Sequence, residues 1–437
     1  MSSDAYNGFR IQKSPSISWT HPSVAPNVWM KEKILRPNDN FFSAKSNRTI
    51  RVYLPPEDIA VEKMALKLTC GIVTVGSTYQ RLANFATSLF EEVRLRMNGF
   101  EHVTRNFNIL SAFMMHLEIP HEVKETQMYD SMGWGPDHIR SIWGQTDQEY
   151  VIPLRWLNTE SGVLPLGAFK MVGGVGENWL EFVIAEPTTV IETDGTNPDI
   201  TIKNVQIIHE QIDSKDDWYR QALCSLIREN GGKWSFPAIK LYQNSVVSSV
   251  SELTIPHKEN NLHSITTALT DISKRNDMTV SGKFENYPKD FGAGCIVRTY
   301  QTDIKGILYP PERCDASDQA VQSYLAYLKA FGFYDSALKR TKFAPPIGID
   351  EFNGSPLDAF FFMHQDLHSI GVDYNRSIDS EFVINPFNLR DDTRPILFKV
   401  DMVNPPPPGL NIVAYHIARY HQIVQLSSSG QVNKILA

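Results

Sequence analysis

Short runs in which apolar and polar residues alternate dominate the chain and predict an all-β protein. In the first half these runs cover residues 49–54, 63–75, 89–97, 149–157, 178–192 and 199–212. In the second half they cover residues 234–256, 295–308, 395–403 and 411–426. Proline and glycine lie at many of the turns between them. Strands of this number and spacing favour two tandem jelly-roll β-sandwiches with short helices and long inserted loops.

A strand–turn–helix unit occurs twice. The first copy has a strand over 92–97, a break at Asn98-Gly99 and a predicted helix; the second has a strand over 302–309, a break at Pro310-Pro311 and a helix predicted over 316–331. Both helices carry apolar residues at i, i+3, i+4 and i+7, which places them on one face. Adding 211 to each apolar position of the first helix gives the second: Leu110, Phe113, Met114 and Leu117, then Val321, Tyr324, Leu325 and Leu328.

A second similarity supports the duplication. Residues 149–153 and 381–386 are both short β-rich runs that meet a proline. Their offset of 232 implies about 21 additional residues in the second half, which loops tolerate because closure entropy grows slowly with length. We therefore predict two similar domains within one chain.

The elements between the strands set the predicted domain boundaries. Helices are expected within 107–146, over 217–229 before Gly231-Gly232, and at 357–367 inside a decorated loop over 341–380. Residues 162–176 are predicted to be a loop. The resulting domains are an N-terminal arm (1–45), a first jelly roll (46–212), a connecting helix and linker (213–233), a second jelly roll (234–426) and a C-terminal tail (427–437). Trp19 and Trp29 suggest that the arm packs on its own body or on a neighbour.

Composition narrows the class of protein. Of 437 residues, 42% are hydrophobic, 11% aromatic and only 21% charged, which suits well-filled cores rather than a disordered chain. The net charge of −7 argues against a surface that coats nucleic acid. The first 36 residues carry only five cations against two carboxylates, which is too few for an arm that neutralises phosphates. The cations are Arg10, Lys13, Lys31, Lys33 and Arg36, and the carboxylates are Asp4 and Glu32.

The cysteines and the first residues indicate the compartment. Cys70, Cys224, Cys295 and Cys314 lack the spacing of metal or redox sites, so we expect reduced thiols in a protein made in a reducing compartment. The first residues lack the basic and apolar segments of a signal peptide. No apolar run approaches the ~18 residues of a membrane helix.

No pattern in the sequence predicts catalysis, a metal site or a cofactor. A histidine pair at i, i+4 needs a third ligand for zinc and, in a metalloprotease, a glutamate beside the first histidine; here that neighbour is Gln365. The glycine-rich stretch 173–176 fits no nucleotide-binding motif and is expected to be a mobile surface loop. The histidine pair is His364 and His368, and a second pair, His416 and His421, differs by five positions on a predicted strand and therefore faces opposite sides.

The other candidates have structural interpretations. Asp213, Asp216 and Asp217 with Lys215 are interpreted as charge complementarity at a helix N-terminus. Asp391, Asp392 and Arg394 are interpreted as a solvated turn. The aromatic clusters 331–334 and 360–362 are interpreted as core filling or as a subunit contact.

Three stretches resemble the double jelly-roll major capsid proteins of tailless icosahedral double-stranded DNA viruses, the lineage that includes adenovirus hexon. These are residues 300–327 with the 304–311 run and the following helix, residues 150–154 with 164–166, and Leu54-Pro55 near the first strand. The resemblance spans roughly residues 46–426, and its motifs are short.

The resemblance implies a structural protein without enzymatic activity or cofactor. Three copies would form a homotrimer whose six jelly rolls make a pseudo-hexagonal capsomer in an icosahedral virion shell. The implied partners are neighbouring capsomers, minor capsid and penton proteins and, as in many members of the lineage, an internal membrane, but no specific nucleic acid sequence.

Two other interpretations remain open. The chain could be another virion structural protein, such as a spike or tail protein. It could also be an enzyme or sugar-binding protein on a tandem cupin-like or lectin-like scaffold. A cupin needs two or three histidines and a glutamate on neighbouring strands of one barrel, and the best candidates are His209, His257 and His263.

Overall fold

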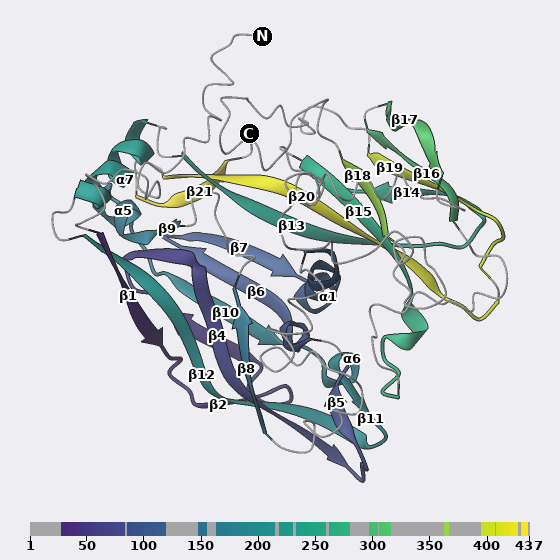
Figure 1. Ribbon diagram of the computed structural model, residues 1–437, viewed down its shortest axis with the longest axis horizontal. Coiled ribbons are helices and arrows are strands. Elements are labelled where there is room, and N and C mark those ends of the chain that lie inside the picture. The colour runs from purple at the N-terminus through teal and green to yellow at the C-terminus, as the bar shows by residue number, and fades with distance from the viewer. Residues whose placement is uncertain are drawn as a thin grey trace, which may run out of the picture.

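The computed structural model forms two β-sandwiches that follow one another along the chain (Figure 1). It describes residues 28–83, 85–118, 147–154, 163–214, 218–229, 233–258, 262–279, 297–304, 306–315, 362–366, 395–406, 408–426 and 430–435. Within these residues every strand before residue 215 pairs with strands of the first sandwich, and every strand after residue 232 with strands of the second. Along the chain, helix α7 (Trp218–Glu229) lies between the two sandwiches.

Two main sheets build the first sandwich. Sheet A has the order β1 (Val28–Leu35), β12 (Thr196–Ser214), β4 (Asp58–Val75), β8 (Gln148–Pro153); β2 (Phe41–Ser43) adds to β12, and β9 (Val163–Pro165) to β4. Sheet B has the order β3 (Thr49–Tyr53), β10 (Trp179–Ile184), β6 (Phe90–Met97), β7 (Phe100–Arg105). Strands β5 (Gln80–Leu82) and β11 (Ile191–Thr193) form a small ribbon at one end. The short helices are α1 (Phe107–Glu118), α5 (Leu166–Met171), α6 (Pro187–Val190) and the 3-10 turn η4 (Ala86–Leu89).

The second sandwich repeats this plan. Sheet D has the order β13 (Lys233–Ser245), β20 (Ile412–Leu426), β15 (Leu262–Asp271), β18 (Phe362–Asp366), with β21 (Val432–Ile435) added to β20. Sheet E has the order β14 (Val250–Ile255), β19 (Ile396–Met402), β16 (Val297–Ile304), β17 (Ile307–Asp315). A 3-10 turn, η6 (Ile272–Lys274), follows β15.

Strand order makes both units jelly rolls. Among the described residues, each unit has eight principal strands, which are all those in its two four-stranded orders without the added strands β2, β9 and β21 or the ribbon β5–β11. When these eight are numbered along the chain, sheets A and D both read 1-8-3-6, and sheets B and E both read 2-7-4-5. Two four-stranded antiparallel sheets wound in this way define the jelly roll. The all-β prediction of two tandem jelly rolls is therefore confirmed.

Alternation of side chains explains why these segments pair as strands with one face buried. In β19 buried and partly exposed residues alternate without exception from Ile396 to Met402. Ile200, Ile202 and Ile207 of β12 are fully buried in the first core. Phe90 and Phe182 meet in that core with ring centroids 5.1 Å apart. No helix in the described part of the chain is long and apolar enough to cross a membrane.

The strand–turn–helix repeat is correct in its first copy and needs a shift in its second. Asn98 and Gly99, at φ 46° and 90°, form the β6–β7 turn, and α1 follows as predicted. In the second copy the turn contains Gly306, at φ 83°, so the structural offset is 306 − 99 = 207. Pro310-Pro311 lies inside β17, which tolerates proline because it is an edge strand whose pairing is interrupted there. The helix predicted over 316–331 lies outside the described residues.

The second similarity paired the wrong strands. The counterpart of β8 by position in the sheet is β18, at residues 362–366, and not the run 381–386, which lies outside the described residues. The helix predicted over 357–367 is also wrong across 362–366. These residues instead pair antiparallel with β15, where a sheet edge offers hydrogen bonds that a single isolated helical turn lacks.

Three other predictions change. Residues 162–176 are not a continuous loop, because β9 and α5 lie within them. The strand predicted over 178–192 is interrupted by α6, which begins at Pro187, where proline suits the first turn of a helix. The segments predicted as arm and tail contain β1, β2 and β21, which are strands of sheets A and D. The first sheet therefore begins at Val28, within the segment predicted as the arm.

Candidate functional site

The histidines singled out in the sequence do not form a metal site in the described residues. His364 lies on β18 opposite Thr266, and His368 lies outside the described chain. His416 is completely buried on β20, where its Nδ1 lies 2.8 Å from the Thr267 hydroxyl. His421 also lies on β20, five residues further on. No three His, Cys, Asp or Glu residues in the described parts of the chain come together to hold a metal.

The histidines considered for a cupin-like barrel belong to different sandwiches. His209 is fully buried on β12 of the first unit, where burial lowers the pKa of its imidazole. His257 follows β14 of the second unit, with its Nδ1 3.0 Å from the Tyr242 hydroxyl. His263 lies on β15. A site built from all three histidines would need them in one sandwich, so His209 of the first unit does not share a barrel with His257 and His263 of the second.

Among the remaining sequence candidates, the structure describes Cys70, Cys224, Cys314 and Asp213. Cys70 and Cys224 are buried thiols outside any disulfide bond, and burial raises the pKa of the Cys70 thiol to about 12, which keeps it protonated. Cys314 lies on β17 and Asp213 on β12. Other candidates lie outside the described residues: Cys295, Lys215, Asp216, Asp217, Asp391, Asp392, Arg394, the cluster 331–334 and residues 360–361.

The two sandwiches meet at a junction formed by several separate contacts. The glycine-rich stretch 173–176 belongs to it and is not the free surface loop that the sequence suggested. Gly174 donates its N–H to Phe169 at 2.7 Å, and Gly176, at φ 123°, packs on the β6–β7 turn, where a Cβ would lie 3.0 Å from Gly99 N. Val175 donates its N–H to Gly430 at 2.7 Å. This stretch therefore ties the first unit to the end of the second.

The end of β20 and strand β21 complete the junction. Val432 donates its N–H to Asn98 at 2.9 Å. Val424 and Val432 are buried in the core of the first unit, although both belong to sheet D. His102 Nδ1 lies 2.9 Å from Gln422 Oε1, with both side chains buried. Apolar burial and paired polar groups thus hold β7 against the far end of sheet D.

Two further contacts join the units elsewhere. Phe113 of α1 lies against Tyr415 of β20, with ring centroids 5.7 Å apart. At the other end of the first sandwich, Thr193 donates its N–H to Met278, which follows β15, at 2.7 Å. Contacts at several separate places oppose a hinge motion between the sandwiches. The chain therefore presents two jelly rolls in a fixed relative orientation.

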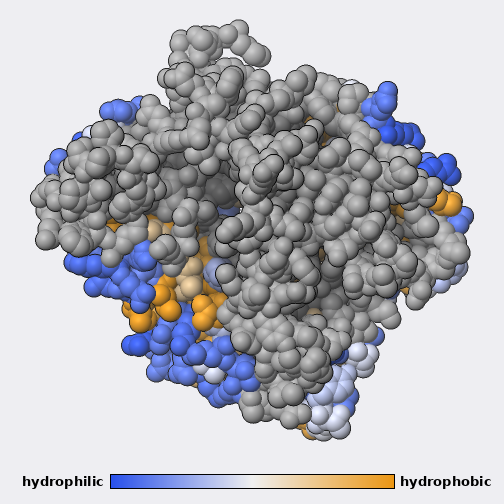
Figure 2. All heavy atoms as spheres, in the orientation of Figure 1, coloured by the Kyte–Doolittle hydropathy of each residue, from blue (hydrophilic) through white to orange (hydrophobic). Residues whose placement is uncertain are grey.

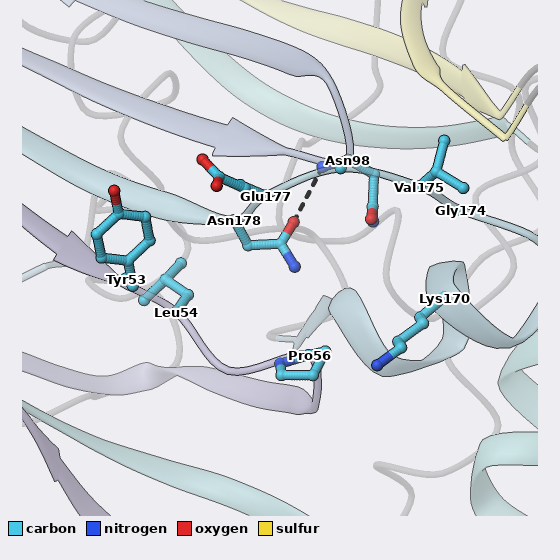
Figure 3. A pocket seen from close by; sticks show the side chains of 10 residues that line it. Tyr53, Leu54, Pro56, Asn98, Lys170, Gly174, Val175, Glu177 and Asn178 are labelled. Carbon is cyan, nitrogen blue, oxygen red and sulfur yellow. Dashed lines mark hydrogen bonds between the residues drawn. The ribbon is translucent and has the colours of Figure 1, made fainter.

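A shallow hollow of about 450 Å³ lies beside the junction (Figure 3). Asn178 accepts the Asn98 N–H at 2.9 Å at its wall, and Lys170 extends into it from α5. Its other lining residues are Tyr53, Leu54, Pro56, Gly174, Val175, Gly176 and Glu177. This lining contains neither an activated nucleophile nor an acid–base pair of the kind that enzymes place in a cleft.

The outer faces of sheets B and E carry opposite charge arrangements. In sheet B the central Glu181 accepts from Arg51 at 2.8 Å and from Arg94 at 3.2 Å on the neighbouring strands. In sheet E the central strand carries Lys399, whose ammonium lies 3.3 Å from Asp303 and 3.9 Å from Glu252. The two sandwiches thus share a strand order but invert the sign of the charges on the same face.

Comparison with known proteins agrees with this geometry. No family model matches the sequence, and no curated protein matches it. Among solved structures the fold is that of double jelly-roll major capsid proteins.

Individual structures match nearly the whole chain. Faustovirus major capsid protein superimposes with a TM-score of 0.60 at 10% identity, covering 92% of this chain and 91% of that one. VP54 of PBCV-1, as fitted into a reconstruction of the virophage Sputnik, gives 0.56 at 9% identity, covering 94% and 97%. The PBCV-1 virus capsid gives 0.51 at 8% identity, covering 94% and 97%. At these identities the likeness establishes the fold.

Proposed function

We propose that this chain is the major capsid protein of an icosahedral double-stranded DNA virus and that its role is purely structural. The observation that carries the proposal is a duplicated jelly roll whose two copies are held in one orientation by a buried junction. Three such chains around a three-fold axis supply six similar units, and a near-hexagonal tile can fill a flat lattice. The likeness to Faustovirus major capsid protein over more than nine tenths of both chains supports this function.

The proposed partners follow from this role. Copies of the chain form a homotrimeric capsomer, and capsomers contact one another and the minor capsid and penton proteins of the shell, with an internal membrane beneath it as a further candidate. The protein resides in the virion, and its buried, reduced thiols at Cys70 and Cys224 fit assembly in a reducing compartment.

The experiment is to express the full chain and measure its mass in native conditions, followed by electron microscopy. We expect a trimer with a hexagonal outline. A monomer at micromolar concentration would overturn the proposal.

A truncation series then tests the N-terminal segment. Removing residues 1–27 should leave the trimer intact and impair closed shells, because sheet A begins at Val28. Removing residues 1–45 should instead unfold the first sandwich, because it deletes β1 and β2. Normal shells after the shorter deletion would contradict the assembly role of this segment.

A further inference from the structure

The same face of the two jelly rolls is covered in one unit and open in the other. In the second unit the outer face of sheet D carries Val413, Tyr415 and Ile417, each exposing 2% or less of its surface. These residues point away from the core of that unit, which their neighbours Ala414 and Ala418 fill. Phe113 of helix α1, from the first unit, packs on this face against Tyr415, with ring centroids 5.7 Å apart. The segment that follows β7 therefore contributes to its cover.

The corresponding face of sheet A carries an apolar row that crosses all four strands. Ile34 lies opposite Ile208, Ile208 opposite Ala65, and Ala65 opposite Pro153. Ile34 exposes 50% of its surface, and the other three are only partly buried. Figure 2 shows apolar atoms among hydrophilic ones at the lower left, over the strands labelled β1 and β12 in Figure 1.

Charged residues frame this row. On one side Glu32 lies directly opposite Glu210, and on the other Lys67 pairs with Glu149 at 2.7 Å. An apolar centre with a polar rim is the usual anatomy of a protein–protein interface. The outer face of sheet A therefore has the composition of a contact surface as well as the position of one.

We propose that this apolar row receives a second copy of the chain in the way that sheet D receives α1. This inference rests on the proposed function and specifies the contact that builds the capsomer. The element that docks is the counterpart of the β6–β7 hairpin and α1, namely the β16–β17 hairpin and the residues after it, where the sequence predicts a helix over 316–331 with an apolar stripe.

The docking element comes from a neighbouring chain, because within one chain it lies far from sheet A. In Figure 1 sheet A lies on the side of the first unit that faces away from the second, whereas β16 and β17 lie at the opposite end of the molecule. The contact between α1 and sheet D joins two different surfaces. Repeating such a contact from chain to chain adds copies head to tail until the ring closes.

The first test changes the row without touching the junction. The double variant Ile34→Asp, Ile208→Asp places two carboxylates on the docking face. It should raise the apparent dissociation constant of the oligomer by at least about tenfold, because desolvated charges oppose apolar contacts. The matched control is Val247→Asp, Val250→Asp, which alters two valines that expose 81% and 65% of their surface on the second unit. Circular dichroism checks that both variants fold, and sedimentation velocity measures the assembly.

The second test maps the contact in the unmodified fold. A photo-crosslinking amino acid at position 208 should capture residues 307–331 of another copy, which mixing of isotopically labelled and unlabelled chains identifies by mass spectrometry. Crosslinks confined to other segments, or an unchanged dissociation constant in the folded row variant, would overturn the inference while leaving a trimeric capsid protein intact. A monomeric wild-type protein would instead overturn the proposed function itself.

Discussion

His416 should make the second sandwich unstable in mild acid. Its imidazole is buried between Thr267 and the Phe398 ring, whose centroid lies 5.3 Å away, and burial lowers its pKa from 6.5 to about 3. The unfolded chain takes up a proton near pH 6.5, whereas the folded chain does not until about pH 3. The folded state is therefore fully stabilised above pH 6.5 and loses stability as the pH falls from 6.5 towards 3.

The magnitude follows from the two pKa values. At pH 5 the unfolded imidazole lies 1.5 pH units below its pKa and the folded one remains neutral, so the loss is about 2 kcal/mol at 1.36 kcal/mol per unit. Urea denaturation followed by circular dichroism at pH 7.5 and pH 5.0 measures this loss. His416→Gln, which cannot titrate, should lose about 2 kcal/mol less than the wild type between the two pH values.

Thr267→Ser is the matched control for this prediction. It keeps the imidazole and a hydroxyl partner on the neighbouring strand, so it should retain the pH dependence of the wild type. An equal loss of stability in His416→Gln and the wild type would show that this histidine is not the acid-sensitive group, and the reasoning from burial would fail.

Two other substitutions test the contacts described above. Gly430→Ala should destabilise the junction by about 1–3 kcal/mol, because its Cβ would lie near Gly173 O and its φ is 79°. The control Gly409→Ala, at φ 96° with open space around it, should cost only about 1 kcal/mol. Hydrogen exchange of β21 distinguishes the two variants, and equal exchange in both would contradict the close approach. Arg81→Met should lower the free energy of unfolding, measured by thermal unfolding, by about 3–5 kcal/mol. The substitution leaves the buried Glu192 carboxylate, 2.8 Å from the Arg81 Nε, without its cation. Adding Glu192→Met should recover most of the lost stability, and no recovery would refute the ion-pair explanation.

Local signals predicted the first copy of the repeat well. Asn-Gly favours a tight hairpin turn, and the apolar spacing after it predicts a helix, so β6, β7 and α1 could all be placed from the sequence. The second copy was shifted because a double proline is a stronger break than a single glycine. The edge position of β17 in its sheet removes the usual penalty for proline, and the sequence does not show which strands are edges.

The junction could not be predicted, because its partners are far apart in the sequence. Val175 and Gly430 bind through backbone atoms, which leave no side-chain signature except the absence of a Cβ at glycine. The stretch 173–176 therefore resembled any flexible loop.

The inverted charges of sheets B and E bear on how the chain finds its fold. Two similar halves in one polypeptide can exchange strands while they form, because strand order alone does not distinguish β10 from β19. If β10 entered sheet E, Glu181 would lie beside Glu252 and Asp303, and in the reverse exchange Lys399 would lie beside Arg51 and Arg94. Like charges on adjacent strands repel. The charges on these outer faces therefore favour the correct assignment of β10 and β19 to their own sheets.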